Sequence, residues 1–207
     1  MNKSLEYIID KWDVDVNQEM PVHLPGTDRV TLAKLFSELG YRTGAEIGTA
    51  RGSYAITISV NNPNLKLYCV DAWATYDGLN DYTDQNQLDE YLSHAMKRLE
   101  PYKNVELIYA LSMDAVKQFK DGSLDFVYID ANHEFPYVAE DLFYWSKKVR
   151  SGGIVSGHDY LKTPRKDGMV QVKEVVHAYT EAFNIKPWFV VDKSTLKRAG
   201  SFFWVKP

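Results

Sequence analysis

Before residue 43, apolar residues recur at the spacing of amphipathic helices in two segments. The positions are Leu5, Ile8, Ile9 and Trp12 in the first segment, and Leu32, Leu35, Phe36 and Leu39 in the second. Residues 21–26 between them read Pro-Val-His-Leu-Pro-Gly, and this proline and glycine content predicts a loop. We therefore expect a helical extension, or cap, over residues 1–43.

From residue 44 onward, short apolar runs alternate with helical periodicity. The runs predict strands at about 44–46, 65–71, 105–109, 124–130 and 154–159, and the periodic segments predict helices at about 53–60, 88–99, 112–119, 136–149 and 172–183. Ser112 is the expected N-cap of the third of these helices. Two last runs, at about 188–191 and 202–205, predict an antiparallel pair, because a parallel crossover needs a dozen or more residues. The pattern is that of a doubly wound α/β domain.

The stretch 44–53, Gly-Ala-Glu-Ile-Gly-Thr-Ala-Arg-Gly-Ser, has the order of a strand, a tight loop and a helix start. Gly48 and Gly52 can adopt positive φ at little cost, and small residues let the backbone approach a ligand. Asp71 ends the next predicted strand about 20–25 residues later, where a carboxylate can accept hydrogen bonds from both hydroxyls of a ribose. Together these features favour a nucleoside site over an aspartate that merely caps a turn.

Acidic or histidine residues end the first, second, fourth and fifth predicted strands. They are Glu46, Asp71, Asp130 and the pair His158-Asp159. In an open α/β sheet the carboxyl ends of the strands form the binding crevice. The loop over residues 72–83 follows Asp71 and is long enough to predict a lid over a ligand. Within this loop, Trp73 either flanks an adenine ring or packs the loop on the body of the domain.

Composition narrows the function classes. The chain has 207 residues, 45% of them hydrophobic, and a formal net charge of −4 with dispersed Lys and Arg, which argues against a dedicated nucleic-acid surface. A single cysteine, Cys69, permits no disulfide within the chain and no cysteine-based zinc site. The first residues lack the apolar core of a signal peptide, and no apolar run is long enough to span a membrane. We therefore expect a cytoplasmic protein without a membrane partner.

Glycine, acid and histidine motifs recur at the predicted strand ends. They are Glu46-x-Gly48-x-Ala50-x-Gly52, Asp71, Asp130-Ala131-Asn132-His133, Gly152-Gly153 and Gly157-His158-Asp159-Tyr160. Together they resemble the class I S-adenosylmethionine-dependent methyltransferases, over about residues 40–207. The spacing of His133, Asp141 and His158-Asp159 is similar to the small-molecule O-methyltransferase-like branch, which includes sugar methyltransferases. The resemblance implies a Rossmann-like, seven-stranded, mostly parallel sheet with helices on both faces and a C-terminal antiparallel hairpin, in a methyltransferase domain over residues 44–207.

The resemblance also implies roles for the residues that match the motifs. Glu46 would orient the methionine amino group of S-adenosyl-L-methionine, Asp71 would hold the ribose hydroxyls, and Asp130 would lie beside the methionine end. Gly48 and Gly52 would leave room for the methionine and ribose parts. The remaining cofactor-binding candidates are Thr49 and Ser53 in the loop, and Trp73, Ser112 and Met113 around the adenine.

Methyl transfer to oxygen requires that an acceptor hydroxyl be aligned with the methyl group and lose its proton. Asp130, His133 and His158 are the catalytic candidates. In one arrangement, Mg²⁺ or another divalent cation, bound by Asp130 and Asp159 with His158 or His133 completing the ligand set, lowers the pKa of the hydroxyl. In another, His133 or His158 is the general base without a metal, and in a third both histidines only brace the loops. The sequence leaves these arrangements open.

The function predicted from these features is methylation of a hydroxyl of a small polar acceptor, a sugar or a hydroxylated aromatic. Residues 130–133, Asp-Ala-Asn-His, replace the Asn/Asp-Pro-Pro-aromatic run of the branches that methylate base amino groups, which argues against a nucleic-acid acceptor. A nicotinamide-dependent oxidoreductase is an alternative, but the chain lacks its longer glycine fingerprint. A non-catalytic S-adenosylmethionine-binding module is another, but it would not need the polar cluster. The N-terminal helices either pair two subunits into a homodimer or close the pocket.

Overall fold

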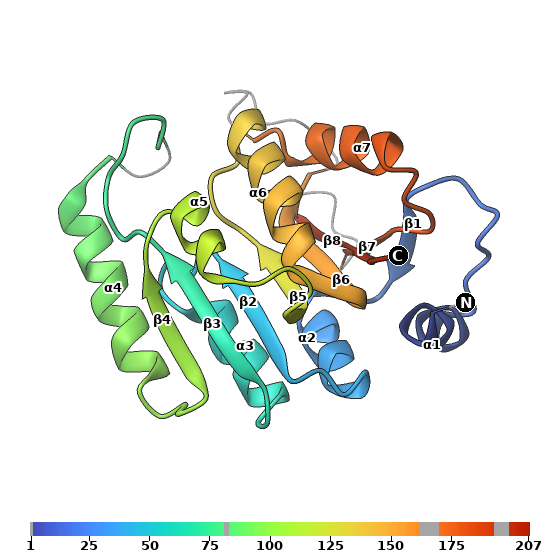
Figure 1. The fold of residues 1–207 in the computed structure, drawn as a ribbon, viewed down its shortest axis with the longest axis horizontal. Coiled ribbons are helices and arrows are strands. Elements are labelled where there is room, and N and C mark those ends of the chain that lie inside the picture. The colour runs from blue at the N-terminus through green and yellow to red at the C-terminus, as the bar shows by residue number, and fades with distance from the viewer. Residues whose placement is uncertain (1, 81–82, 162–169, 193–198) are drawn as a thin grey trace.

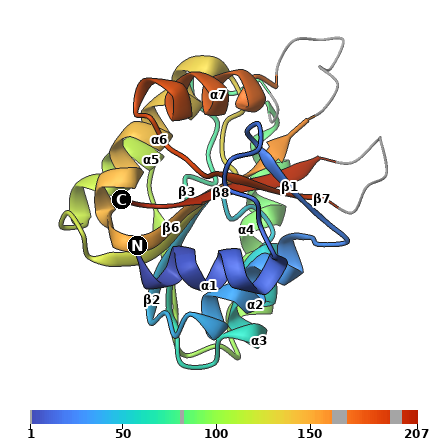
Figure 2. The ribbon, with the colours of Figure 1, turned by 90° about the vertical axis from the view of Figure 1, so that its right-hand side faces the viewer.

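The structure is a computed structural model of the chain, and it describes residues 2–80, 83–161, 170–192 and 199–207. Helices lie on both faces of a mixed sheet (Figure 1). The helices are α1 (Lys3–Trp12), α2 (Arg29–Glu38), α3 (Ser53–Asn61), α4 (Gln85–Leu99), α5 (Ser112–Ala115), α6 (Phe135–Lys148) and α7 (Val172–Ala182). The strands are β1 (Val22–Pro25), β2 (Thr43–Ile47), β3 (Lys66–Asp71), β4 (Val105–Tyr109), β5 (Leu124–Ile129), β6 (Val149–Tyr160), β7 (Phe189–Asp192) and β8 (Gly200–Val205). α1, α2 and α3 cover one face, and α5, α6 and α7 cover the other (Figure 2).

The sheet confirms the predicted α/β class and the direction of its strands. Its strand order is β1-β7-β8-β6-β5-β2-β3-β4. Neighbouring strands pair in parallel except for β8, which pairs antiparallel with both β6 and β7. After β2 the chain adds β3 and β4 on one side and then returns to add β5 and β6 on the other. The carboxyl ends of β2 and β5 therefore meet at the switch point where ligands bind in such sheets.

The segment that the sequence predicted as a loop, residues 21–26, contains an eighth strand. β1 pairs in parallel with β7, with Val22 opposite Phe189. Val22 and Leu24 are buried, whereas His23 and Pro25 point to the exposed side. The seven-stranded prediction was therefore short by one strand. Four alternating residues give a weak local signal next to two prolines and a glycine, and their partner strand lies near the other end of the chain.

Two local predictions on the α5–α6 side were also wrong. The N-cap of α5 is Leu111, and Ser112 is its first helical residue. The Ser112 hydroxyl instead donates a hydrogen bond to the Asp141 carboxylate and accepts one from Trp145 Nε1 at 2.8 Å. Val149, expected at the end of the following helix, begins β6 and pairs with Leu124. In both cases contacts with distant residues outweigh the local preference.

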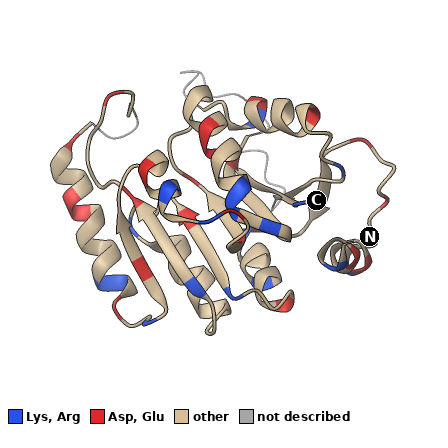
Figure 3. Ribbon diagram, in the orientation of Figure 1, with Lys and Arg blue, Asp and Glu red and all other residues tan. Residues whose placement is uncertain are grey.

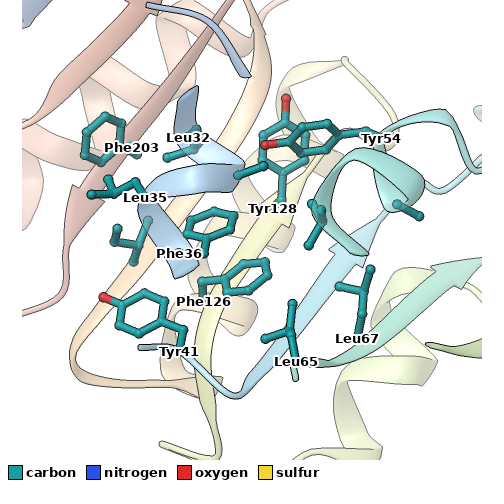
Figure 4. Close-up of a cluster of buried hydrophobic side chains, with 14 of the residues drawn as sticks. Leu32, Leu35, Phe36, Tyr41, Tyr54, Leu65, Leu67, Phe126, Tyr128 and Phe203 are labelled. Atoms are coloured by element: carbon teal, nitrogen blue, oxygen red, sulfur yellow. The ribbon is translucent and has the colours of Figure 1, made fainter. Parts of the chain in front are cut away.

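The core on the α2–α3 side of the sheet is rich in aromatic rings. The rings of Phe36 and Phe126 are stacked with centroids 3.8 Å apart. Figure 4 shows Phe36 of α2 against Phe126 of β5, and Leu35 of α2 on the side of Phe203. A Cβ atom at Gly44 of β2 would lie 2.2 Å from the Phe126 ring, so this packing requires glycine there. The core thus fixes the positions of β2 and β5, whose carboxyl ends carry the candidate site.

Charged side chains are spread over the molecule. Figure 3 shows Lys and Arg positions interspersed with Asp and Glu positions along the helices and strands. Within the part of the chain that the structure describes, no helix combines the length and the apolar character needed to cross a membrane.

Candidate functional site

A cavity of about 560 Å³ lies at the carboxyl ends of β2, β3, β5 and β6. The register explains why the predicted polar residues meet there. Ile47 of β2 is opposite Val70 of β3 on one side and Ile129 of β5 on the other. Asp71 and Asp130 follow those partners directly, and their side chains line the cavity together with Glu46. Strand ends that are distant in sequence therefore converge, as the sequence predicted.

The loop after β2 approaches the end of β5 closely at Gly48. Gly48 has a φ of 89°, and a Cβ atom there would lie 2.0 Å from the Asp130 carbonyl oxygen. No side chain fits this position, so the loop can pass over the strand end only with glycine. Gly48 also donates its backbone N–H to the Val70 carbonyl at 2.8 Å, which ties the loop to β3.

Gly52 lies outside the residues that line the cavity, unlike Gly48. It is the N-cap of α3, with a φ of 74°. A Cβ atom there would lie 3.1 Å from the Leu99 side chain. Its small size therefore serves the packing of α3 against α4, where the resemblance implied room for a ligand. Thr49 and Ser53, by contrast, both line the cavity.

Asp71 is held by backbone groups of two loops. Its Oδ2 accepts a hydrogen bond from Ala50 N and its Oδ1 accepts one from Trp73 N, each at 2.8 Å. Burial raises the pKa of Asp71, while the hydrogen bonds to its carboxylate oppose this rise. Trp73 lines the cavity and also donates its Nε1–H to the Ala50 carbonyl at 2.8 Å. Trp73 therefore anchors the loop, as one of the two sequence-based alternatives stated, and it also borders the cavity.

Glu46 is a buried carboxyl group that lines the cavity. The residue is 2% exposed, and its Oε2 has no hydrogen-bond partner among the described residues. Burial raises the pKa of Glu46 to about 8. A buried acceptor without a partner is costly, so this oxygen fits a ligand that brings a hydrogen-bond donor or a positive charge.

Two carboxylates and two imidazoles gather in the cavity at the carboxyl ends of β5 and β6. His133 Nε2 lies 2.8 Å from Asp159 Oδ2 and 3.7 Å from Asp130 Oδ1. His158 Nδ1 lies 3.6 Å from Asp159 Oδ2 and 3.8 Å from Asp130 Oδ1. The three candidate catalytic residues Asp130, His133 and His158 are therefore brought together, with Asp159 between the histidines.

The two ion pairs set the protonation of this cluster. Burial alone would lower the pKa of His133, but hydrogen bonds to Asp130 and Asp159 outweigh it and raise the pKa to about 11. The pKa of His158 is also raised, because its contacts with the same carboxylates outweigh burial. Burial would raise the pKa of Asp159, but the neighbouring imidazoles hold it well below the usual range. The pKa shifts therefore favour the protonated forms of His133 and His158 and the ionised form of Asp159.

Asp130, His133 and Asp159 also form a group that could hold a metal ion. One ligand atom from each lies within 4.8 Å of the other two. The sequence-based prediction named the same two aspartates with either His158 or His133 as the third ligand. Two carboxylate oxygens and an imidazole nitrogen suit a divalent cation, and in this group the imidazole is that of His133.

Ser112 and Met113, the adenine candidates, differ in their surroundings. Ser112 lines the cavity. Met113 is partly buried and packs against the hydrophobic core on the α5–α6 side. The first turn of α5 therefore presents one of the two residues to a ligand.

Sequence reasoning missed the hydrogen bonds that join the loop after β3 to the loop after β5. Asn132 Nδ2 donates to the Gly78 carbonyl at 2.9 Å, and Asn80 Nδ2 donates to Glu134 Oε1 at 2.6 Å. Tyr76 and Leu79 of the same loop line the cavity. The predicted lid over residues 72–83 thus covers part of the site as far as residue 80, while residues 81–82 lie outside the described residues. Asn132 belongs to the motif at residues 130–133, but nothing in the sequence identifies the Gly78 carbonyl as its partner.

Arg29 and Tyr54 also line the cavity and were not predicted. Tyr54 directly follows Ser53 in the first turn of α3, so its position could have been inferred from the loop motif. Arg29 comes from the N-terminal segment, where sequence alone offers no link to the strand ends.

The amino-acid sequence matches a family model described as a methyltransferase domain over residues 45–160. This segment is more than half of the chain and includes the loop after β2 and the strand ends of β3, β5 and β6. A comparison with curated protein sequences gives no match.

Solved structures of methyltransferases share the fold. An O-methyltransferase from Bacillus cereus in complex with SAH has a TM-score of 0.66 and 17% identity, covering 100% of this chain and 92% of its own. The O-methyltransferase TomG from Streptomyces achromogenes, involved in tomaymycin synthesis and solved with SAM, has a TM-score of 0.66 and 18% identity, covering 100% and 91%. The N-methyltransferase NodS from Bradyrhizobium japonicum has a TM-score of 0.59 and 14% identity, covering 86% and 94%. At these identities the likeness shows the fold alone.

Proposed function

The chain belongs to the methyltransferase-domain family and is a methyltransferase; from this premise we propose that it transfers a methyl group from S-adenosylmethionine to a hydroxyl oxygen of a small polar acceptor, a sugar or a hydroxylated aromatic. Similar folds occur in O-methyltransferases solved with SAH or SAM, which supports the donor and the reaction type. The acidic strand ends around the cavity argue against a polyanionic acceptor.

The observation that carries the proposal is the Oε2 atom of Glu46, which has no hydrogen-bond partner among the described residues and lies in the same cavity as Asp71. Glu46 Oε2 has no partner among the described residues and suits the ammonium group of a methionine moiety. Asp71 keeps its carboxylate in place through two backbone N–H groups and has further lone pairs for ribose hydroxyls. When bound, S-adenosylmethionine supplies a methyl group that is already activated on a sulfonium sulfur. The protein then needs to orient the acceptor and take up its proton.

The Asp130–His133–His158–Asp159 cluster is proposed to handle that proton. Asp130, His133 and Asp159 suit a divalent cation, which would lower the pKa of an acceptor hydroxyl. His158 lies outside this ligand group but within 4 Å of both carboxylates, so it is the candidate base at its ring nitrogen. Without a cation, Asp130 and His158 are the candidates for accepting the proton, because the raised pKa of His133 keeps its imidazole protonated, and Asp159 orients the two imidazoles.

Ligand binding tests the donor site directly. In isothermal titration calorimetry, we expect S-adenosylmethionine and its demethylated product to bind and NAD not to bind. A panel of sugars and hydroxylated aromatics, assayed by mass spectrometry for a gain of one methyl group, then identifies the acceptor class. Binding of NAD in place of the adenosyl ligands would contradict the proposal. If the donor binds but only nitrogen or carbon atoms are methylated, the proposed donor stands and the proposed hydroxyl acceptor is wrong.

Removal of divalent cations distinguishes a cluster that works with a bound cation from one in which the side chains act without it. If a cation is required, EDTA should abolish methyl transfer and Mg²⁺ or Mn²⁺ should restore it, whereas the affinity for the demethylated product stays unchanged. Asp159→Asn should then lose the response to added cation. Activity that persists in EDTA would instead leave the proton transfer to the imidazoles and carboxylates alone.

A further inference from the structure

Arg29 is fixed at the wall of the cavity by its own helix and by α3. It is the first residue of α2 and follows the N-cap Asp28, whose carboxylate accepts a hydrogen bond from Thr31 N at 3.0 Å. The Arg29 carbonyl accepts a hydrogen bond from the Tyr54 hydroxyl at 2.9 Å. The backbone of Arg29 is therefore attached to the helix that follows the loop after β2, and its side chain lines the cavity.

The guanidinium of Arg29 lacks an anionic partner among the residues that the structure describes. Its central carbon lies 5.3 Å from the centre of the Tyr54 ring, which supports the cation on one side. The nearby Asp28 carboxylate is used in the helix cap. A planar guanidinium has donors arranged for two parallel hydrogen bonds to a carboxylate, and here these donors face a cavity.

The charge of Arg29 affects the pKa of both Glu46 and His158. Burial raises the pKa of Glu46, and the positive charge of Arg29 is among the groups that oppose this rise. The same charge opposes the rise in the pKa of His158 that its carboxylate neighbours cause. Arg29 therefore lies in a region of the cavity from which its charge acts on both Glu46 and His158. A ligand that fills this region displaces water from the guanidinium, and a cation without a counter-charge in such a place is costly.

We propose that the Arg29 guanidinium binds a carboxylate of a bound ligand at this position. The inference rests on the proposed function, and it adds a positive recognition group to the cavity that Glu46 also lines. Two sources of the carboxylate share this chemistry. One is the α-carboxylate of the methionine part of the donor, with Glu46 taking the ammonium of the same zwitterion. The other is an acid group on the acceptor, which would make the acceptor a hydroxylated acid.

The experiment compares the wild type with Arg29→Gln, Arg29→Lys and Lys34→Gln. Lys34 is exposed on the same helix and outside the cavity, so Lys34→Gln removes an equal charge without touching the site. The probes are S-adenosylmethionine and its decarboxylated form, which keeps the sulfonium and the ammonium but lacks the carboxylate. Calorimetry gives the dissociation constants, and thermal melts show that each variant is folded.

If Arg29 binds the carboxylate of the donor, Arg29→Gln should weaken S-adenosylmethionine binding about 10- to 100-fold. The affinity for the decarboxylated form should stay unchanged. Arg29→Lys should fall between, because it keeps the charge but loses the paired hydrogen bonds. If Arg29 instead binds an acid group of the acceptor, Arg29→Gln should leave donor binding unchanged. Its KM should then rise about 10- to 100-fold for a hydroxylated aromatic acid but not for the neutral amide of that acid. Lys34→Gln should match the wild type in every measurement.

Other results overturn the inference. If Arg29→Gln binds both donor forms and turns over both acceptors as the wild type does, Arg29 recognises no carboxylate. Equal weakening of both donor forms would assign Arg29 a general role in shaping the pocket and would also contradict the inference. A wild type that binds no adenosyl ligand at all would defeat the proposed function itself, and the inference with it, whereas the preceding outcomes leave the proposed function intact.

Discussion

Single residues in and below the cavity have protonation states set by burial. Glu46 and Asp141 are both carboxylic acids that are almost fully buried, at 2% and 3% exposure. Burial raises the pKa of Glu46 to about 8 and that of Asp141 to about 7. Glu46 lines the cavity and has an oxygen without a partner, whereas Asp141 accepts a hydrogen bond from Ser112. The first is therefore suited to ligand binding, and the second supports the first turn of α5.

Glu46→Gln should weaken binding of S-adenosylmethionine by roughly 10-fold or more, because an amide cannot neutralise the ammonium of the ligand. In the wild type, affinity should rise as the pH increases through about 8, since the ionised form of Glu46 is the one that binds a cation. The variant should lose this rise. Calorimetry between pH 6.5 and 9 measures both effects. Glu90→Gln, at an exposed position of α4, is the control, and an unchanged affinity in Glu46→Gln would remove Glu46 from the donor site.

Asp141 should make the protein less stable as the pH rises. Its pKa is higher in the folded chain than in the unfolded one, so the folded chain holds an extra proton between about pH 4 and pH 7. The free energy of unfolding should therefore fall across this interval, by roughly 1–4 kcal/mol from this group. Urea titrations at both ends of the interval should show a smaller fall in Asp141→Asn. Asp114→Asn, at an exposed side chain, should behave as the wild type, and an equal fall in all three proteins would contradict the argument.

Among the elements, the loop after β3 depends on α6 for its position over the cavity. Tyr137 of α6 donates its hydroxyl to the Asp77 carbonyl at 3.2 Å, and Asn132 donates to the Gly78 carbonyl. Gly78 has a φ of 90°, and a Cβ atom there would lie 1.7 Å from the Tyr137 hydroxyl oxygen. The loop can therefore approach α6 this closely only with glycine at residue 78.

Gly78→Ala should separate this loop from α6 and weaken donor binding several-fold, because Tyr76 and Leu79 of the loop line the cavity. The matched control is Gly40→Ala, which has a φ of 69° but no atom within 4 Å of the added Cβ. Both variants carry the strain of a positive φ, and only the first displaces the loop. Calorimetry with the demethylated product distinguishes them. Equal affinities in the two variants would show that the loop contributes nothing to the site.

The molecule as a whole gathers the site from the ends of β2, β3, β5 and β6, from the loops after β2, β3, β4 and β5, and from residues of α2, α3, α4 and α5. The packing of Phe36 on Phe126 sets α2 against the sheet, and the pairing of β2 with β3 and β5 aligns Asp71 and Asp130. A ligand in this cavity contacts segments from much of the chain. Its binding should therefore stabilise the entire fold rather than one loop.

The demethylated product at about 100 times its dissociation constant should raise the melting temperature by roughly 5–10 °C, following the mass-action gain in stability of a chain of this size. Differential scanning fluorimetry measures the shift. NAD at the same concentration should produce none. A shift with NAD, or the absence of one with the demethylated product, would argue that the cavity is not a donor site.

The sequence by itself determined the α/β class, the order of the elements from residue 43 onward, the C-terminal hairpin and the acidic strand ends, and the methyltransferase family inferred from them is confirmed. Those features are local: hydrophobic periodicity, glycines at positive φ and polar residues after strands are all written within a few neighbouring positions. Tertiary structure alone decided that residues 22–25 join β7, that Ser112 binds Asp141, and that His133 is the imidazole closest to Asp159. It also decided that Arg29 faces the cavity. Each of these depends on pairing between residues far apart in the chain, and local sequence carries no record of which distant partner will be nearest once the core has packed.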